Sequence, residues 1–168
     1  MFGYIKRKYN YFIINNVLDN QFKPKAFQKK RECFKRLGNK IADDVRIVGP
    51  IQSSCKMEIG KGTFVGRCLS CEGNGPVAIG ENCDIAPHVT ILTGTHEIGD
   101  SSRRAGKGIT TGVTIGNGTW IGARTMILPG IRIGNGCVIA AGAIVTKDIP
   151  DNFMAIGVPA KIKPIEDN

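Results

Sequence analysis

The chain has few aromatic residues and only two histidines in 168 positions. Aromatic side chains make up 7% of the sequence, whereas glycine occurs 22 times. This balance argues against a helical bundle and favours many tight turns around a core of small aliphatic side chains. Two histidines also cannot supply, within one chain, the three ligands that a histidine-bound zinc enzyme needs.

Long hydrophobic runs are missing as well. No stretch approaches the roughly 18 apolar residues of a membrane-spanning helix, and the only apolar run in residues 1–20 is Phe12-Ile13-Ile14, which is too short for a secretory signal. We therefore expect a cytoplasmic protein whose cysteines are reduced thiols. Cys68 and Cys71 form a CxxC pair, but no second pair completes a zinc site, so we expect small buried thiols and no metal.

Acidic residues are scarce at the start of the chain. Residues 1–40 hold 11 Lys and Arg against two acids, and residues 41–168 hold 12 of each sign, so the whole net charge of +9 lies in the first forty positions. We hypothesise that this basic segment holds the protein near the anionic inner face of the membrane, with no nucleic acid involved. The alternative is a solvated helical face that aids solubility.

A six-residue repeat fills most of the chain. An aliphatic residue recurs every six positions over residues 115–145, and the same register appears over residues 79–91 and 41–65, where Ser53 interrupts it. A period of six fits neither a helix nor a long strand. It predicts an all-β solenoid in which each unit forms a short strand and a corner, three units close a triangular coil, and the aliphatic side chains stack inward.

The repeat is interrupted twice. Residues 65–79 contain two residues more than the register allows, and the polar, glycine-rich segment 95–112 loses the pattern altogether. We expect residues 95–112 to form a loop extruded from the coils. Loops on rigid scaffolds commonly carry function, so this loop is the first place to look for a site.

The ends of the chain differ from its middle. Residues 23–38 carry apolar side chains at helical spacing and predict an amphipathic helix that ends near Gly38 and covers the open end of the coils. We therefore divide the chain into a basic N-terminal segment with this helix (1–40), the coils with their extruded loop (41–155) and a basic C-terminal tail (156–168).

The most specific pattern lies between Val113 and Pro164, in the string WIGA…PG…IG…AAGAIVTKDIP…GVPAK, with ILTGTHEI before it. Over roughly residues 41–165 the chain resembles hexapeptide-repeat sugar O-acetyltransferases. It resembles those of capsule, colanic acid and lipopolysaccharide gene clusters and, more distantly, the maltose and galactoside acetyltransferases. The resemblance implies a left-handed parallel β-helix, a homotrimer with active sites between subunits, and acetyl-CoA bound along the C-terminal coils.

Acetyl transfer to a hydroxyl needs a base for the hydroxyl proton and hydrogen-bond donors for the charge that grows on the thioester oxygen. The resemblance makes His96, at the mouth of the extruded loop, the general base. A neutral imidazole suits this task because its reference pKa is about 6.5. Glu97, Asp84 or a backbone carbonyl would hold the other ring nitrogen. His88 is expected to face outward near a corner.

The resemblance also assigns residues to acetyl-CoA. The backbone N–H of Ala123 would donate to the oxyanion, Trp120 would pack beside the acyl and acceptor pocket, and Ala141 would pair with the pantetheine amides. The residues assigned to the phosphates and adenine are Thr146, Lys147, Lys161 and Lys163.

The acceptor side departs further from the family pattern. The candidates for contact with the sugar are Asp84, Glu72, Asn74, Arg103 and Arg104. The two arginines belong to the extruded loop, where they could read an acidic sugar or cover the CoA. This loop looks closer to the polysaccharide-cluster enzymes, and we expect a surface-polysaccharide precursor as the acceptor.

Two other functions fit the sequence less well. Serine O-acetyltransferases share the β-helix and the CoA groove, but they carry a long helical N-terminal domain for which forty residues are too few. A non-catalytic scaffold would have no need of a histidine at the loop mouth beside a CoA-type tail. We therefore predict an acetyl-CoA-dependent O-acetyltransferase.

Overall fold

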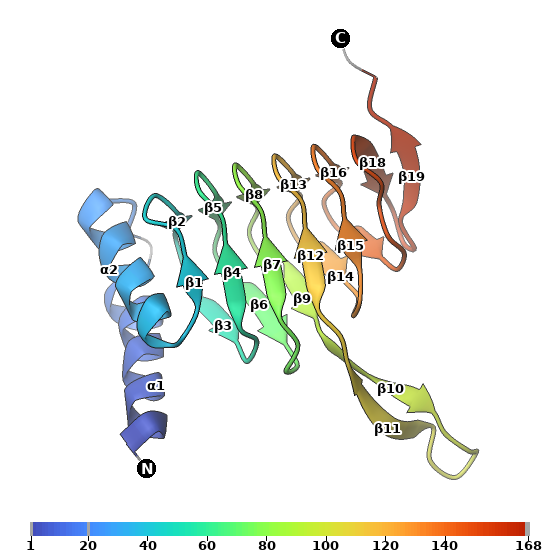
Figure 1. The fold of residues 1–168 in the computed structure, drawn as a ribbon, viewed down its shortest axis with the longest axis horizontal. Helices are drawn as coiled ribbons and strands as arrows, with labels where there is room; N and C mark the ends of the chain where they lie inside the picture. The colour runs from blue at the N-terminus through green and yellow to red at the C-terminus, as the bar shows by residue number, and fades with distance from the viewer. Residues whose placement is uncertain (1, 20, 167–168) are drawn as a thin grey trace.

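The computed structural model describes residues 2–19 and 21–166 of the chain. A stack of triangular coils runs from a helical layer at its N-terminal end to a pair of strands at its C-terminal end (Figure 1). Residues 1, 20, 167 and 168, which the predicted end segments include, lie outside the described residues.

Three sheets form the sides of the coils, and each grows by one parallel strand per coil. Sheet A contains β1 (Lys40–Ile41), β4 (Met57–Ile59), β7 (Val77–Ile79), β12 (Val113–Ile115) and β15 (Arg132–Ile133). Sheet B contains β2 (Arg46–Ile47), β5 (Phe64–Val65), β8 (Asp84–Ile85), β13 (Trp120–Ile121), β16 (Val138–Ile139), β18 (Phe153–Ile156) and β19 (Lys161–Pro164). Sheet C contains β3 (Ile51–Ser53), β6 (Leu69–Glu72), β9 (Thr90–Leu92), β14 (Met126–Ile127) and β17 (Ile144–Val145). We call the connections between the sheets the A–B, B–C and C–A corners.

The core confirms the predicted register. The inward side chains are Ile41, Ile59, Ile79, Ile115 and Ile133 on sheet A, Ile47, Val65, Ile85, Ile121, Ile139 and Ala155 on sheet B, and Ser53, Cys71, Ile91, Ile127 and Val145 on sheet C, all of them buried. Stacking of these columns removes apolar surface from water, which a single coil could not do. Ser53, where the aliphatic pattern lapses, is tolerated because its hydroxyl donates to the carbonyl of Cys55 and accepts from its N–H.

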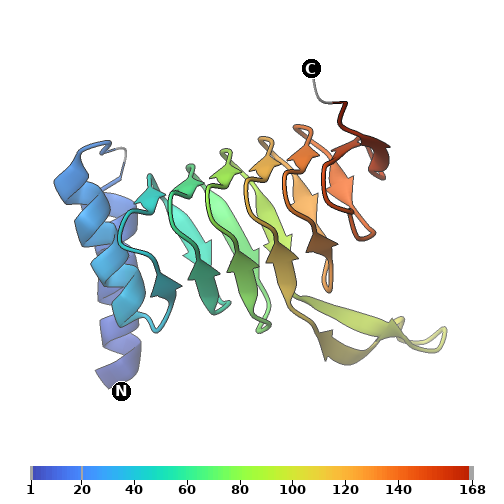
Figure 2. The same cartoon turned by 45° about the horizontal axis from the view of Figure 1, so that its top comes forward.

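The two interruptions lie at the C–A corner. Thr114 pairs with Arg132, eighteen positions on, whereas Glu58 pairs with Ala78, twenty positions on, so the two extra residues are absorbed in the turn between β6 and β7. The longer insertion is an antiparallel hairpin of β10 (Gly94–Ile98) and β11 (Ala105–Thr110), which leaves the stack between β9 and β12 (Figure 2).

The helical layer is larger than the sequence predicted. The expected helix is α2 (Pro24–Arg36), and Gly38 follows it with a φ of 83°. In addition, α1 (Phe2–Phe12) continues into a π-helical turn, η1 (Ile13–Val17). Phe34 of α2 and Ile14 of η1 have no exposed surface and belong to the coil core, so the helices close the N-terminal end of the stack.

Lys30 of α2 is buried within this layer. Its ammonium group donates to the carbonyls of Val48 and Gln21. Burial lowers the pKa of Lys30 to about 8, because the charged form loses its hydration.

The C-terminal segment is also more ordered than a tail. β18 spans Phe153–Ile156 and so crosses the boundary predicted at residue 155, and β19 folds back antiparallel on it. Among the residues that the structure describes, no helix is long and apolar enough to span a membrane, and no group of His, Cys, Asp and Glu side chains is arranged to hold a metal ion.

Most of the cysteines are buried and free, as expected for small core thiols. Burial raises the pKa of Cys71 and of Cys83, which keeps both thiols protonated. The prediction was wrong for Cys68, which is partly exposed in the B–C corner with a φ of 57°.

Candidate active site

The hairpin presents His96. His96 lies on β10 opposite Gly108 of β11, and its side chain is exposed. The turn that closes the hairpin is held by Asp100, whose Oδ1 accepts hydrogen bonds from the hydroxyl and N–H of Ser102 and from the N–H of Arg103. These donors, the Ser102 hydroxyl first, lower the pKa of Asp100 and keep it ionised as a turn-forming acceptor.

A backbone carbonyl orients the His96 ring. Nδ1 of His96 lies 2.9 Å from the carbonyl oxygen of Gly106. A carbonyl oxygen can only accept, so in the neutral ring Nδ1 carries the hydrogen and Nε2 keeps its lone pair. Gly106 lets the two strands of the hairpin lie close enough for this contact. A Cβ at position 106 would lie 3.0 Å from the carbonyl oxygen of Glu97 on the opposite strand.

Glu97 does not hold the ring in the described part of the chain. Its carboxylate is exposed and makes no hydrogen bond or ion pair there. Of the partners considered from the sequence, the carbonyl is the one that the hairpin brings to His96. The sequence could not identify Gly106, because the contact depends on the register of the hairpin.

A second set of residues lines the outer face of sheet B. Asp84 pairs with Phe64 on one side and with Trp120 on the other, and all three point away from the core. They line a groove of about 400 Å³ that reaches Ala86 and Pro87 at the B–C corner. Trp120 is 55% exposed. An aromatic–carboxylate–aromatic row offers flat apolar faces and a hydrogen-bond acceptor, which is the chemistry of a small polar ligand site.

The row continues in both directions. Toward the helices, the guanidinium carbon of Arg46 lies 5.3 Å from the centre of the Phe64 ring. Toward the C-terminus, Trp120 is followed in register by Val138, Met154 and Lys163. Phe64 and Arg46 were missed from the sequence, although both immediately precede an inward residue of sheet B, as Asp84 and Trp120 do.

The B–C corner brings Ala123 and Ala141 into successive coils. The carbonyl of Ala123 accepts the N–H of Gly142 at 2.8 Å, while the N–H of Ala123 has no acceptor among the described residues. Gly122 permits this close stacking, since a Cβ there would lie 2.5 Å from the nitrogen of Ala141. The corner therefore holds an open backbone donor beside the groove. His88 is exposed at this same corner, as expected, with a φ of 62°.

The residues predicted to bind phosphates and adenine belong to the C-terminal end of the stack. Thr146 and Lys147 follow β17 and are exposed, and Lys161 and Lys163 are exposed on β19. Thr146 and Lys147 lie at the C–A corner, whereas Lys161 and Lys163 lie on the edge strand of sheet B, so one chain does not bring the four residues together. Each pair carries exposed positive charge that can meet an anionic group.

The remaining acceptor candidates are dispersed. Glu72 accepts a hydrogen bond from the Ser70 hydroxyl at 2.7 Å, and Asn74 is exposed in the turn that follows. Arg103 and Arg104 are exposed at the tip of the hairpin, where Arg104 donates to the carbonyl of Gly99. None of these four lines the Trp120 groove of the same chain.

His96 cannot reach the Trp120 groove of its own chain. The hairpin leaves the triangular coil at the C–A corner, and sheet B is the side opposite that corner. A site that unites the two must therefore take His96 from one chain and the groove from another.

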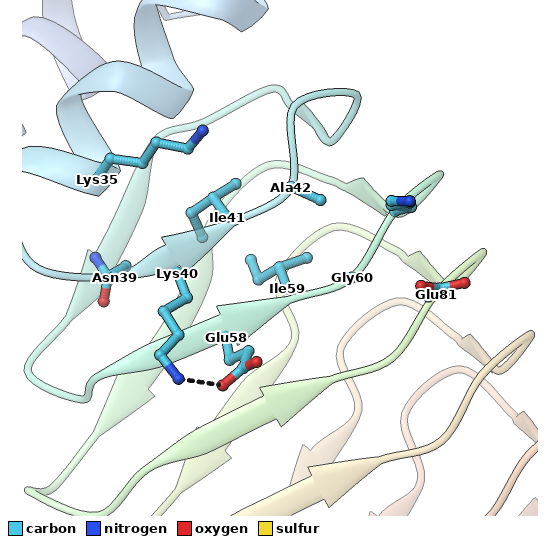
Figure 3. Close-up of a pocket in the computed structure, with 10 residues that line it drawn as sticks. Lys35, Asn39, Lys40, Ile41, Ala42, Glu58, Ile59, Gly60 and Glu81 are labelled. Carbon is cyan, nitrogen blue, oxygen red and sulfur yellow. Dashed lines mark hydrogen bonds and ion pairs between the residues drawn. The ribbon is translucent and has the colours of Figure 1, made fainter.

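A further hollow, of about 470 Å³, lies at the first coils beside the end of α2 (Figure 3). Three charged groups on its rim form ion pairs. Lys40 pairs with Glu58 at 3.3 Å, and Lys35 pairs with the nearby Asp43 at 2.6 Å. The hydrogen bond and charge of Lys35 lower the pKa of Asp43. No residue predicted for the active site lines this hollow, and Lys35, Lys40 and Glu58 on its rim already have partners.

Comparison with known proteins identifies the family of this chain. Residues 112–147 match the family described as bacterial transferase hexapeptide (six repeats). The galactoside O-acetyltransferase of Escherichia coli (strain K12) is 34% identical over 145 residues, which cover 85% of this chain and 71% of that protein. The chain belongs to the hexapeptide-repeat O-acetyltransferase family.

Solved structures support the same conclusion. A galactoside acetyltransferase in complex with coenzyme A superposes with a TM-score of 0.76 at 30% identity, covering 98% of this chain and 82% of that one. The polySia-specific acetyltransferase NeuO superposes with a TM-score of 0.65 at 32% identity, covering 76% of this chain and 61% of that one. The fold is thus the left-handed parallel β-helix predicted, and the protein is an acetyl-CoA-dependent O-acetyltransferase.

Proposed function

We propose that this enzyme moves the acetyl group of acetyl-CoA onto a hydroxyl of a surface-polysaccharide precursor, with His96 as general base. The observation that carries the proposal is the contact between Nδ1 of His96 and the Gly106 carbonyl. In the neutral ring this contact leaves the lone pair of Nε2 free to accept a proton, as a base requires.

The reaction needs no covalent enzyme intermediate. Nε2 of His96 takes the proton of the sugar hydroxyl while its oxygen attacks the thioester carbon. The open N–H of Ala123 donates to the carbonyl oxygen as it gains charge. When the carbon–sulfur bond breaks, His96 returns the proton to the leaving sulfur. The glutamate beside the base, Glu97, is exposed and would give the imidazolium a second contact in the assembled enzyme.

The cofactor arm fits the row along sheet B. Trp120 and Lys163 are separated by three strand spacings, about 14 Å in total. In this proposal Trp120 packs against the acyl end, the backbone of Ala141 holds the amides of the arm, and Lys163 meets the phosphates. The other residues proposed for the phosphates and adenine are Thr146, Lys147 and Lys161.

The acceptor would lie at the N-terminal end of the same row. Phe64 and Trp120 offer faces for a sugar ring, and Asp84 between them accepts hydroxyl hydrogens. Arg103 and Arg104 at the hairpin tip favour an acidic sugar, in keeping with the polySia specificity of the relative NeuO. Glu72 and Asn74, at the C–A corner from which the hairpin leaves, would contribute from the chain that supplies His96.

A homotrimer would complete the site. Three copies related by a threefold axis can each place a hairpin against the sheet B row of a neighbour. This supplies the second chain that the opposed positions of His96 and Trp120 require. The trimer would work in the cytoplasm, with its basic N-terminal segments drawn to the anionic inner face of the membrane.

The direct test is release of thiol from acetyl-CoA with a panel of sugars, nucleotide sugars and serine. His96→Ala should lower kcat by about 10²–10⁴-fold, the usual contribution of a general base, while coenzyme A binding persists. Activity that survives this change would exclude His96 as the base. A response to serine alone would favour the serine acetyltransferase function instead.

Mixed trimers test the shared site. His96→Ala and Trp120→Ala should each be inactive, and co-refolding equal amounts should restore about a quarter of the sites, those that combine an intact hairpin with an intact neighbouring row. No recovery in verified mixed trimers would place both residues in one chain's site.

A further inference from the structure

Helix α1 has one face bound to the coils. Arg7 and Tyr11 both donate to the carbonyl of Ser53, at 2.9 and 2.6 Å. One turn later Ile14 is buried, and the Asn15 amide bonds both backbone groups of Ile51. These contacts fix the rotation of α1, and with it the residues that the opposite face presents.

The opposite face carries an apolar stripe. Ile5, Tyr9 and Phe12 follow one another at helical spacing and are 59%, 59% and 56% exposed. Val17 and Phe22, farther along the same layer, are also exposed. Large apolar side chains that remain in water on a helix already anchored by its other face indicate a partner for that face.

The six other large exposed apolar residues of the described chain lie elsewhere. They are Ile98, Ile109, Trp120, Ile156, Val158 and Ile162, on the hairpin, in the groove and at the C-terminal end. The proposed active site and trimer contacts account for those positions, but they do not account for α1 at the other end of the stack (Figure 1).

The helical layer that carries the stripe is also basic. The sequence has no acidic residue before Asp19, and Lys6 of α1 and Lys25 and Lys29 of α2 are exposed. The helical layer therefore combines an apolar stripe with basic side chains, the pattern of a helix that lies in the plane of an anionic bilayer.

We infer that α1 docks on an anionic membrane by inserting Ile5, Tyr9 and Phe12 between lipid headgroups, with the lysines of the layer on the phosphates. A second copy of the chain fits this face poorly, because it would set lysines against lysines. Nucleic acid would engage the lysines but leave the apolar stripe in water.

Docking in this way would stand the coil stack upright on the membrane. Phe64, Asp84 and Trp120 lie one, two and three strands from β2 of the first coil, or about 5 to 15 Å along sheet B. The acceptor groove would thus open close to the surface, within reach of a sugar linked to a lipid. In the proposed trimer, three copies of α1 would lie at the same end and bind with avidity.

Vesicle sedimentation of the full-length enzyme tests the inference, with phosphatidylcholine vesicles compared with vesicles of about one-third phosphatidylglycerol. The wild type should pellet with the anionic vesicles only. The variant Ile5→Ser/Tyr9→Ser/Phe12→Ser should lose about 100-fold in affinity, and Lys6→Gln/Lys25→Gln/Lys29→Gln should bind both vesicle types weakly. Ile98→Ser is the matched control, because it removes an exposed apolar side chain far from α1. With its assembly verified to match that of the wild type by gel filtration, it should bind as the wild type does.

Three results would overturn the inference. They are equal pelleting of the wild type with both vesicle types or with neither, full binding by the triple serine variant, and complete displacement from vesicles by duplex DNA. Ile5, Tyr9 and Phe12 are more than half exposed, and the three lysines are exposed, so the melting temperature should not change. An unchanged melting temperature separates lost docking from lost folding. The purpose of docking rests on the proposed lipid-linked acceptor, but vesicle binding is measured without acceptor or acetyl-CoA. A failed acetyl-transfer test would therefore leave the docking result intact.

Discussion

The A–B and B–C corners follow similar backbone paths, but their backbone N–H groups differ in whether a side chain accepts from them. At the A–B corner the N–H groups of Glu81, Asn117 and Asn135 each donate, at 2.8 Å, to a side chain of the next coil. The acceptors are the side-chain oxygens of Asn117, Asn135 and Asp151. Each coil is thus tied to the next by a ladder of side chains.

At the B–C corner the equivalent positions hold Pro87, Ala123 and Ala141. Proline has no N–H to satisfy, and alanine has no side chain that could accept one. The N–H of Ala123 therefore stays open, beside the groove lined by Trp120. The ladder that stabilises the A–B corner would, at the B–C corner, occupy the N–H proposed to bind the oxyanion.

The corners also differ where φ is positive. The A–B corner uses glycine or asparagine at these positions, Gly62, Asn82, Gly118, Gly136 and Asn152. The B–C corner uses glycine in its last coil, Gly142, but the three coils before it place Cys68, His88 and Arg124 there, with φ values of 57°, 62° and 60°. Side chains other than glycine and asparagine are disfavoured in this region. Strain of this kind concentrates at functional sites, and here it adjoins the groove and Ala123.

The largest expected effect comes from giving the B–C corner the ladder of the A–B corner. In Ala141→Asn the new amide oxygen should accept the N–H of Ala123, as Asn135 accepts that of Asn117. We expect kcat to fall by about 10²–10³-fold, the usual loss of an oxyanion donor, with an unchanged or higher melting temperature. Steady-state kinetics and thermal unfolding measure the two.

Two variants control this experiment. Ala141→Leu adds similar bulk without an acceptor, so it should retain more activity than Ala141→Asn. Asn135→Ala opens the other ladder and should lower the free energy of unfolding by about 1 kcal/mol without changing kcat. If Leu and Asn at position 141 were equally damaging, steric blockage rather than a filled oxyanion site would be the cause.

The next largest effect is a loss of folding stability, which should be of the same size at the two corners. A Cβ at Gly80 would lie 2.8 Å from the nitrogen of Asn117, and one at Gly122 would lie 2.5 Å from that of Ala141. Gly80→Ala and Gly122→Ala should each lower the free energy of unfolding by about 2–3 kcal/mol, since backbone must move. Denaturant unfolding measures both. A much smaller loss at Gly122 would show that the B–C corner is looser, which would undermine its role as a fixed donor.

The smallest effect depends on pH and belongs to the A–B corner alone. Hydrogen bonds from the side chain and backbone of Asn135 lower the pKa of Asp151. A carboxyl whose folded pKa is depressed stabilises the fold above its unfolded pKa, and this contribution is lost as pH falls through the folded value. The melting temperature should therefore fall more steeply below about pH 4 in the wild type than in Asp151→Asn. Asp44→Asn is the control, because Asp44 is an exposed A–B corner carboxylate without a hydrogen bond in the described structure, and it should follow the wild-type curve.

The repeat and its inward columns could be predicted from the sequence, because every sixth side chain is buried in the core and is therefore usually aliphatic. The sequence did not predict α1, whose aromatic and asparagine-rich helix forms through anchors to Ser53 and Ile51 that are distant in the chain. The contact between Gly106 and His96 was not predicted either, because it depends on how β10 pairs with β11 in the hairpin. The open N–H of Ala123 could have been found by comparing residues eighteen apart, Asn117 with Asn135 and Ala123 with Ala141.

The two ends of the stack bear on assembly. A parallel solenoid exposes an unsatisfied strand edge at each end, where another molecule could add and start a filament. At the first coil the Asn15 side chain occupies the backbone groups of Ile51 on the edge strand of sheet C. At the last coil β19 reverses direction, and its antiparallel edge has the wrong hydrogen-bond spacing for a further parallel coil. The two ends of the coil stack are therefore capped against the addition of further coils. Coils could be gained or lost between these caps without exposing a strand edge at which the enzyme would polymerise.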